Sequence, residues 1–306
     1  MISSKFKHSL IISSMLLLQA CSGQNGISFN KIGNSVLNLV GLGAAKSAYD
    51  MQDSLKKATN ELTREEEYYL GRAVAARIIS DYPIYNQEKI NIYINKVGLA
   101  LVNFSDKPET FGGYHFIVLD TEEVNALAAP GGFIFLTKGL LNLLPDEDGL
   151  AAVLAHEIVH VEKQHGLKSI SAENMTKAIQ SIGKLASSLN CAEVLTSASA
   201  VFGAAVDDMI GKIINSGYSR EQEAEADKEA LSILAKSGYS VNAFVDTLSL
   251  LKQRESQAKK GSWTRSHPGL EERLDQIVSE LKKNPVQDEK KGREIRFARF
   301  EQEIRF

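Results

Sequence analysis

Two histidines and one glutamate form the part of this sequence best suited to chemistry. His156 and His160 stand four residues apart, Glu157 directly follows the first of them, and residues 150–165 contain neither Gly nor Pro. On one continuous helix this spacing places both imidazoles on the same face, about one turn apart, where their nitrogens can bind one zinc ion. Glu157 can then act on a water molecule at the metal without binding the metal itself. The sequence therefore predicts Zn²⁺ as the cofactor.

The residues around this motif are Ala, Val, Leu and Ile, which indicates that the helix is buried. Inside a protein, His and Glu side chains are costly unless they are paired or bound to a ligand. The alternative to a metal site is a pair of core histidines that hydrogen-bond to backbone groups.

A zinc site needs a third protein ligand, and the residues after the second histidine exclude one class of metalloprotease. The metzincin pattern requires Gly three and His six residues further on, where Lys163 and Gly166 stand. A thermolysin-like site instead takes a Glu from a second helix. Ser219 and Gln222 form a capping-box pattern, which predicts that such a helix begins there and ends before Gly238.

This second helix carries two carboxylates on a face that is otherwise apolar. Counting turns places Glu223 and Asp227 on that face. We expect Glu223 to be the third metal ligand and Asp227 to accept a hydrogen bond from a ligating imidazole. The alternative is an unusually acidic surface helix, and we interpret the charges on the other faces in that way, as solvated side chains: Glu221, Glu225, Lys228 and Glu229.

Helices and a short sheet are needed to position these residues. Thr63 and Glu66 belong to a capping-box pattern that opens a helix, and the apolar patterns predict helices over 63–80 and 87–102, strands over 114–119, 125–128 and 132–136, and almost only helices after Thr137. The order of helices, short sheet and helices predicts an α+β fold that is mainly helical.

Length and charge limit the classes of function. The chain has 306 residues, 35 Lys and Arg against 38 Asp and Glu, a net charge of -3 and 43% hydrophobic residues. This is enough for a real core in one large domain or two small ones, which argues against bulk disorder. A slightly acidic chain offers no long-range attraction to nucleic acid, so we expect no nucleic-acid partner.

The first residues have the layout of a secretory leader. A short basic stretch precedes an apolar run too short to span a bilayer, and the run ends at Cys21 in a pattern that resembles a bacterial lipobox. We expect a signal peptide over 1–20, lipidation of Cys21, and attachment to the outer membrane facing the periplasm. The alternative is an ordinary cleaved signal peptide and a secreted or periplasmic protein. With Cys21 lipidated, Cys191 has no disulfide partner.

Composition divides the rest of the chain. Residues 21–60 are rich in Gly, Ser and Asn and predict a flexible tether, 61–284 form the main domain, and 285–306 form a charged amphipathic tail. Within the domain, residues 169–216 are rich in Ser, Ala and Gly. They predict either a mobile helical hairpin or a plain pair of packed helices.

Four segments together resemble one protease family. His156 to His160, Ser219 to Asp227, the segment 125–132 and the late Ser266-His267-Pro268 are similar to the gluzincin family that includes the CaaX prenyl proteases, HtpX and the periplasmic BepA-like proteases. The resemblance covers about residues 62–281. It implies a zincin-like metalloprotease domain of the soluble, lipid-anchored branch, without membrane spans and tetratricopeptide repeats.

The resemblance also implies roles that spacing alone does not show. The segment of Asn125, Ala126, Leu127 and Ala128 looks like the edge strand beside the active-site helix, on which an extended substrate pairs through its backbone. His267 corresponds to a histidine that fills the open metal position at rest or stabilises an oxyanion, and Arg273 is a second candidate for the electrostatic role. For His165 we expect a simple place at a helix C-terminus.

The sequence therefore predicts a zinc-dependent endopeptidase with Glu157 as general base. We expect it to degrade misfolded or unassembled proteins in the bacterial periplasm or at the outer membrane, with unfolded polypeptides as partners. The alternative is a lipoprotein chaperone or assembly factor for outer-membrane proteins, whose zinc site is structural or autoinhibited.

Overall fold

The computed structural model describes residues 62–171, 173–175, 203–257, 263–283, 293 and 295–298. The expected signal peptide, the tether, Cys21 and Cys191 lie outside these residues, as does most of the segment 169–216. The division of the chain into domains stays a prediction.

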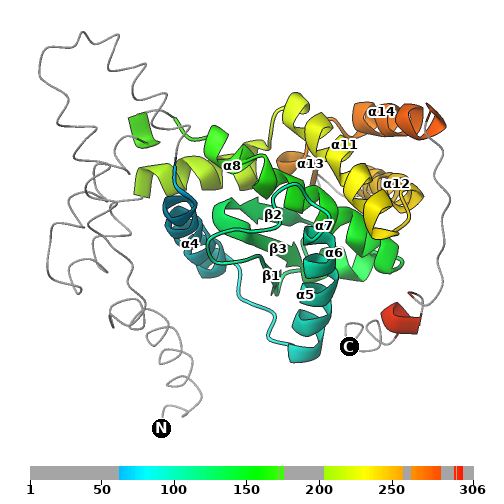
Figure 1. Cartoon of the computed structure of the whole chain (residues 1–306), viewed down its shortest axis with the longest axis horizontal. Helices are drawn as coiled ribbons and strands as arrows, with labels where there is room; N and C mark the ends of the chain where they lie inside the picture. The colour runs from blue at the N-terminus through cyan, green and yellow to red at the C-terminus, as the bar shows by residue number, and fades with distance from the viewer. Residues whose placement is uncertain are drawn as a thin grey trace, which may run out of the picture.

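The elements follow one another as helices, sheet and helices (Figure 1). In chain order they are α4 (Arg64–Asp81), α5 (Glu88–Val102), β1 (His115–Leu119), β2 (Ala126–Ala129), the 3-10 turn η1 (Pro130–Gly132), β3 (Phe133–Thr137), α6 (Lys138–Leu143), α7 (Glu147–Glu162), α8 (His165–Lys168), the π-helical segment η2 (Gly211–Ser216), α11 (Arg220–Ser237), α12 (Asn242–Gln257), α13 (Trp263–Ser266) and α14 (Leu270–Lys283). The predicted α+β, mainly helical fold is confirmed, and the three predicted strands are each displaced by about one residue. Among the described helices, none combines the length and apolar character needed to cross a bilayer.

Within the described ranges the sheet has three strands in the order β1-β3-β2, so β2 lies at an edge. β3 pairs in parallel with β1 and antiparallel with β2. The hairpin between β2 and β3 turns through Gly131 and Gly132, whose φ angles of 74° and 101° favour glycine. A Cβ on Gly132 would also lie 2.5 Å from the backbone oxygen of Gly113.

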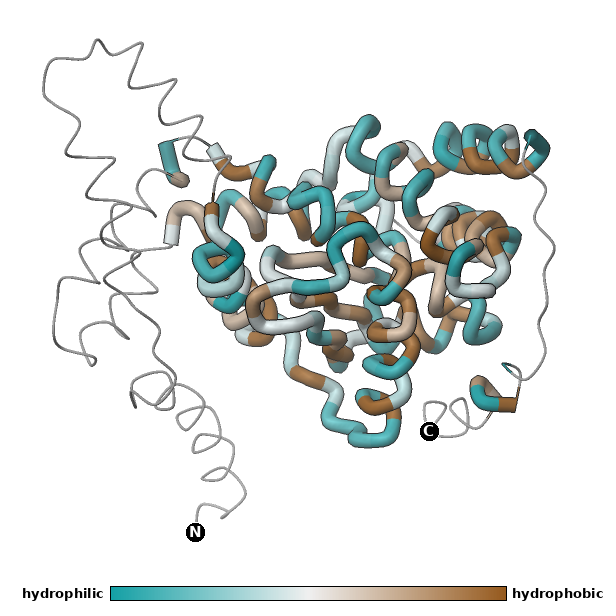
Figure 2. Tube along the Cα trace, viewed as in Figure 1, coloured by the Kyte–Doolittle hydropathy of each residue, from teal (hydrophilic) through white to brown (hydrophobic). Residues whose placement is uncertain are grey.

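Both faces of the sheet are covered, which explains why its strands are apolar throughout rather than alternating. One face packs with α5 and α7 through a cluster that includes Phe116, Val118, Ala126, Ala128, Ile134 and Leu136. The other face packs with α4 and η2 through Leu127, Ala129, Phe133 and Phe135. The hydrophobic segments accordingly gather in the middle of the body in Figure 2.

Helix α7 runs through the middle of the core, between the sheet and the helices α11 and α12. Its central residues are Leu, Ala and Val on all sides, and every residue from Glu147 to Glu162 is buried. A helix that is apolar all round is stable only when neighbours cover it on all sides. Asp146 caps its first turn by accepting a hydrogen bond from Gly149 N at 2.8 Å.

The expectation of one continuous helix from 150 to 165 is wrong. Helix α7 ends at Glu162, Gln164 takes a left-handed conformation with φ 56° and ψ 37°, and His165 begins the separate helix α8. The buried carboxylate of Glu67 on α4 accepts a hydrogen bond from Gln164 Nε2 at 2.7 Å. This contact from a distant element favours the break, which the absence of Gly and Pro does not predict.

The end of the chain contacts the start of α7. Arg296 pairs with the buried carboxylate of Glu147, Arg293 donates to Asp148 Oδ2 at 3.1 Å, and Phe297 is buried in the core. These basic side chains neutralise two carboxylates in the first turn of the helix that carries the histidine motif.

Candidate metal centre

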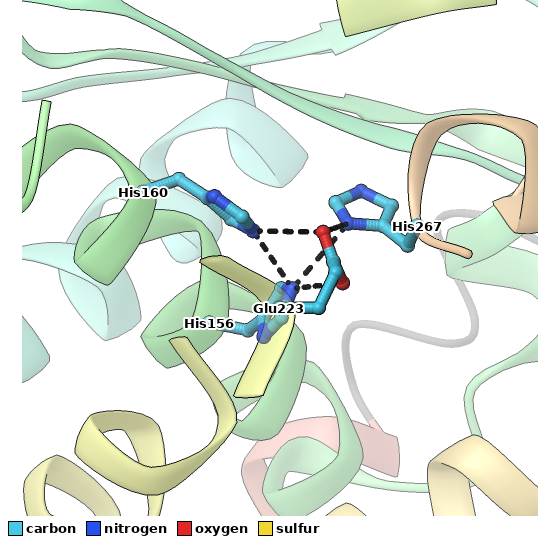
Figure 3. A group of neighbouring side chains, drawn as sticks. All are labelled: His156, His160, Glu223 and His267. Carbon is cyan, nitrogen blue, oxygen red and sulfur yellow. Dashed lines mark hydrogen bonds and ion pairs between the residues drawn. The ribbon is translucent and has the colours of Figure 1, made fainter. Parts of the chain in front are cut away.

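Four buried side chains converge on one point (Figure 3). His156 and His160 come from α7, Glu223 from the first turn of α11, and His267 from the residue after α13. One nitrogen or oxygen of each lies within 4.8 Å of the others. The two Nε2 atoms of His156 and His160 are 3.0 Å apart, and Glu223 Oε1 lies 3.5 Å from His160 Nε2 and 3.2 Å from His267 Nδ1. All four side chains are at most 1% exposed.

The backbone before α11 allows this convergence. Ser219 and Gln222 form the predicted capping box, and Gly238 ends the helix in a left-handed conformation. Gly217 has a φ of 68°, and a Cβ there would lie 2.5 Å from the backbone oxygen of Arg265. Glycine therefore lets the start of α11 approach the segment that carries His267.

The donor set fits a metal ion better than a hydrogen-bonded core. Two imidazole nitrogens face each other beside a carboxylate, and these are the ligands that Zn²⁺ prefers in proteins. Within the part of the chain that the structure describes, no hydrogen bond reaches either carboxylate oxygen of Glu157, although both oxygens are buried. His267 Nε2 lies 3.4 Å from Glu157 Oε1. Burial raises the pKa of Glu157, an effect that His267 and His156 reduce. A buried carboxyl group without a hydrogen-bond partner is unusual unless it has a chemical role.

Asp227 and Arg273 contact two members of this cluster, His156 and Glu223 respectively. Asp227 Oδ1 lies 3.0 Å from Nδ1 of His156. Arg273 donates to both oxygens of Asp227 at 2.7 Å, and its Nη1 lies 2.7 Å from Glu223 Oε2. Burial raises the pKa of both carboxyl groups, but the lowering effects of neighbouring groups, of which the positive charge of Arg273 is the largest, together outweigh this increase. The pKa of Asp227 is therefore below its ordinary value, and the pKa of Glu223 is well below its ordinary value. Both carboxylates are therefore charged when the guanidinium is present.

His160 has partners that the sequence did not indicate. Its Nδ1 lies 2.8 Å from Nδ1 of His165, and His165 Nε2 lies 3.1 Å from Oε2 of Glu225. The ring of Tyr218 stacks on His160 at 4.2 Å between centroids. The expected place of His165 at a helix C-terminus is wrong, because His165 begins α8, where it is fully buried and burial lowers its pKa. Glu225 is half exposed, yet it is paired rather than simply solvated.

The edge strand β2 lies beside the cluster, and three of its outward backbone groups have partners within the molecule. Thr137 N donates to Asn125 O at 3.0 Å, so the odd-numbered residues pair with β3 and Ala126 and Ala128 turn their backbone groups outward. Ala128 O accepts from the Tyr218 hydroxyl at 3.3 Å. Ala126 O lies 3.4 Å from His267 Nε2. The side chain of Asn125 accepts from Ala126 N at 3.0 Å and from the hydroxyl of Ser266.

Comparison with known proteins gives matches over most of the chain. Residues 88–281 match the model of the family described as "Peptidase family M48". The chain is 28% identical over 232 residues to the "Beta-barrel assembly-enhancing protease" of Escherichia coli (strain K12), and 30% identical over 233 residues to the "Putative beta-barrel assembly-enhancing protease" of Vibrio cholerae. These alignments cover 75% and 76% of this chain, but the chain spans 47% of each relative. It is also 27% identical to the "Metalloprotease YcaL" of Escherichia coli (strain K12), over 87% of this chain and 93% of that protein.

Proposed function

The chain belongs to peptidase family M48, and from that premise we propose that it is a zinc-dependent endopeptidase that degrades misfolded or unassembled polypeptides in the bacterial periplasm or at the outer membrane. The observation that carries this proposal is the convergence of His156, His160 and Glu223 in a buried cluster, with the buried carboxylate of Glu157 beside it. This combination can bind a metal and move a proton within one site.

In this proposal His156, His160 and Glu223 hold the metal. Asp227 positions the ring of His156, and Arg273 neutralises the buried carboxylates of Glu223 and Asp227. Zinc, when bound, polarises the scissile carbonyl and makes a water molecule more acidic. Glu157 accepts the proton of the attacking water on a carboxylate oxygen and then donates it to the nitrogen of the leaving amine. Because the guanidinium of Arg273 contacts Glu223 and Asp227, we propose that it neutralises these two carboxylates rather than stabilising an oxyanion.

The substrate class follows from strand β2. An extended polypeptide can pair with the outward backbone groups of Ala126 and Ala128, as strands add to the edges of sheets. Most extended segments of a folded protein are already paired within it, so the geometry favours unfolded or unassembled chains. Tyr218 and His267 occupy the carbonyl groups of this edge in the structure, and substrate must displace them.

His267 is placed to control access to both parts of the site. Its Nδ1 lies within reach of the metal ligands, 3.4 Å from His156 Nε2, while its Nε2 faces Ala126 O. We propose that His267 fills the open metal position at rest and leaves it when a substrate pairs with β2.

Cleavage of labelled casein by the full chain tests this function. We expect the wild-type protein to cleave casein, a chelator to abolish cleavage, and added Zn²⁺ to restore it. His267→Ala should raise the cleavage rate by about tenfold, the change expected if the closed form outnumbers the open form about ten to one. The measurement is the rate at which the labelled peptides are released.

A histidine of β1 provides the matched control. His115 stacks on Phe133 within the sheet, so His115→Ala should leave the casein rate within about twofold of wild type. Cleavage that survives chelation would contradict the metal mechanism. A rate unchanged by His267→Ala would contradict the resting role of His267.

The names of two relatives favour a second candidate function. One is called a beta-barrel assembly-enhancing protease and the other a putative one. We therefore propose, as the alternative, that this chain is a lipoprotein chaperone or assembly factor for outer-membrane proteins. A protein that bound zinc but cleaved no casein, either as wild type or as His267→Ala, would support this assembly role without proteolysis.

We also propose that the protein is a lipoprotein of the bacterial envelope, attached through Cys21. The support is the leader pattern of the first residues, in which a basic stretch and a short apolar run end at this cysteine. Labelled palmitate should enter the wild-type protein in bacterial cells and be absent from Cys21→Ser. Equal labelling of both proteins would contradict the anchor.

A further inference from the structure

A line of hydrogen-bonding groups leads from the metal cluster to the protein surface. His160 points Nε2 at the cluster and Nδ1 at His165 Nδ1, 2.8 Å away. The other ring nitrogen of His165, Nε2, lies 3.1 Å from Oε2 of Glu225. His160 and His165 are buried, whereas the Glu225 side chain is 46% exposed. The line therefore ends in a carboxylate that solvent can reach.

The broken helix makes this contact possible. Residues five apart on a continuous α-helix point about 140° away from each other, so the side chains of His160 and His165 could not meet. The left-handed conformation of Gln164 ends α7 and turns the chain so that His165 faces back toward His160. Helices commonly end with a residue in this conformation, which is usually Gly because other residues adopt it less easily. Glu67 holds the turn through its hydrogen bond with Gln164 Nε2.

The contacts of His160, His165 and Glu225 are consistent with a single assignment of protons to the ring nitrogens. A histidine that binds a metal through Nε2 carries its proton on Nδ1, so Nδ1 of His160 donates to Nδ1 of His165. Nδ1 of His165 must then accept, which places the proton of His165 on Nε2, where it is donated to the carboxylate of Glu225. Each donor thus faces an acceptor along the whole line.

The other imidazole ligand is supported in a simpler way. His156 also points Nε2 at the cluster and has the carboxylate of Asp227 directly at Nδ1. For His160, the neutral imidazole of His165 lies between the ligand and the carboxylate of Glu225. Both ligands thus have a partner that fixes the ring, although the expected site contained only Asp227.

We propose that His165 and Glu225 are positioning residues that hold His160 in the tautomer and orientation in which it binds the metal. This inference rests on the proposed function, since it requires a metal at the cluster. Partners of this kind raise the basicity of a ligand and fix its ring, and their loss weakens metal binding by about 10- to 100-fold. His165→Ala removes the partner of His160, and Glu225→Gln weakens the acceptor at the end of the line.

Zinc affinity tests this inference without relying on catalysis. The metal-free full chain is titrated with Zn²⁺ in competition with a chromogenic chelator. We expect the dissociation constant to rise by about 10- to 100-fold in His165→Ala and by a smaller factor in Glu225→Gln. His165→Gln should recover part of the loss, because its amide oxygen can accept from His160 Nδ1. The visible spectrum of the Co²⁺-loaded proteins should change in the same order.

Two further measurements distinguish a positioning role from a general loss of folding stability. Glu229→Gln removes the same charge one turn further along α11 and should leave zinc affinity unchanged. Glu225 is half exposed, so Glu225→Gln should keep the thermal unfolding temperature of the metal-free protein. Zinc affinity in both His165→Ala and Glu225→Gln within about twofold of wild type would overturn the inference, as would an equal loss in Glu229→Gln. A wild-type chain that bound no zinc would instead refute the proposed function.

Discussion

Replacing Glu157 with Gln is expected to abolish peptide-bond cleavage and to leave the metal bound. The amide keeps the shape of the side chain but cannot accept the proton of the attacking water. General acid–base groups contribute about 10²- to 10⁴-fold to rate, so we expect casein cleavage to fall by about a thousandfold or more. Glu157 is not proposed as a ligand, so zinc content, measured by elemental analysis, should stay at the wild-type value.

The same helix supplies the matched control for this variant. Glu162 also lies buried on α7, and its carboxylate accepts a hydrogen bond from Asp106 N at 3.1 Å. Glu162→Gln removes a comparable buried charge, and we expect casein cleavage to remain within a few-fold of wild type. Undiminished cleavage by Glu157→Gln would sink the proposed mechanism, and loss of zinc from this variant would show that Glu157 serves the metal instead.

The candidate site was predictable from sequence where it depends on local spacing. His156 and His160 share a face of α7 because one helical turn separates them, and the capping box fixes where α11 begins. Asp227 follows one turn after Glu223, so both carboxylates lie on the same face of α11. These features require only a helix and its starting point, whereas the meeting of the two faces requires α11 to pack against α7.

What the sequence did not reveal depends on contacts between distant elements. His165 reaches His160 through a left-handed residue, Gln164, held by Glu67, a residue 97 positions away in the chain. Tyr218 lies just before α11 in the sequence, but its stacking on His160 depends on how α11 packs against α7. Helical periodicity does not describe these contacts.

The fold shows the same division. The strands and the helix caps were expected because apolar runs, glycines and capping boxes mark them locally. The contacts of Arg293 and Arg296 with Asp148 and Glu147 were not, because two basic residues in a charged tail do not indicate which carboxylates they will meet.

Replacing Arg273 with Met is expected to destabilise the metal-free protein by about 3–5 kcal/mol. The guanidinium, 3% exposed, contacts both Asp227 and Glu223, and removing it leaves these buried carboxylates with less positive charge around them. Urea unfolding in the presence of a chelator measures the loss. Arg220→Met is the control: Arg220 forms an exposed ion pair with Glu272 at 2.9 Å, and exposed pairs contribute at most about 1 kcal/mol.

Zinc should reduce the loss of stability caused by Arg273→Met. A bound divalent cation supplies positive charge beside Glu223, so zinc should stabilise the variant more than it stabilises the wild type. At the same zinc concentration, the increase in unfolding free energy on adding zinc should therefore be larger for Arg273→Met. A smaller increase would mean that Arg273 mainly orients Glu223 for the metal. A larger increase would mean that its main role is to neutralise the two carboxylates until the metal arrives.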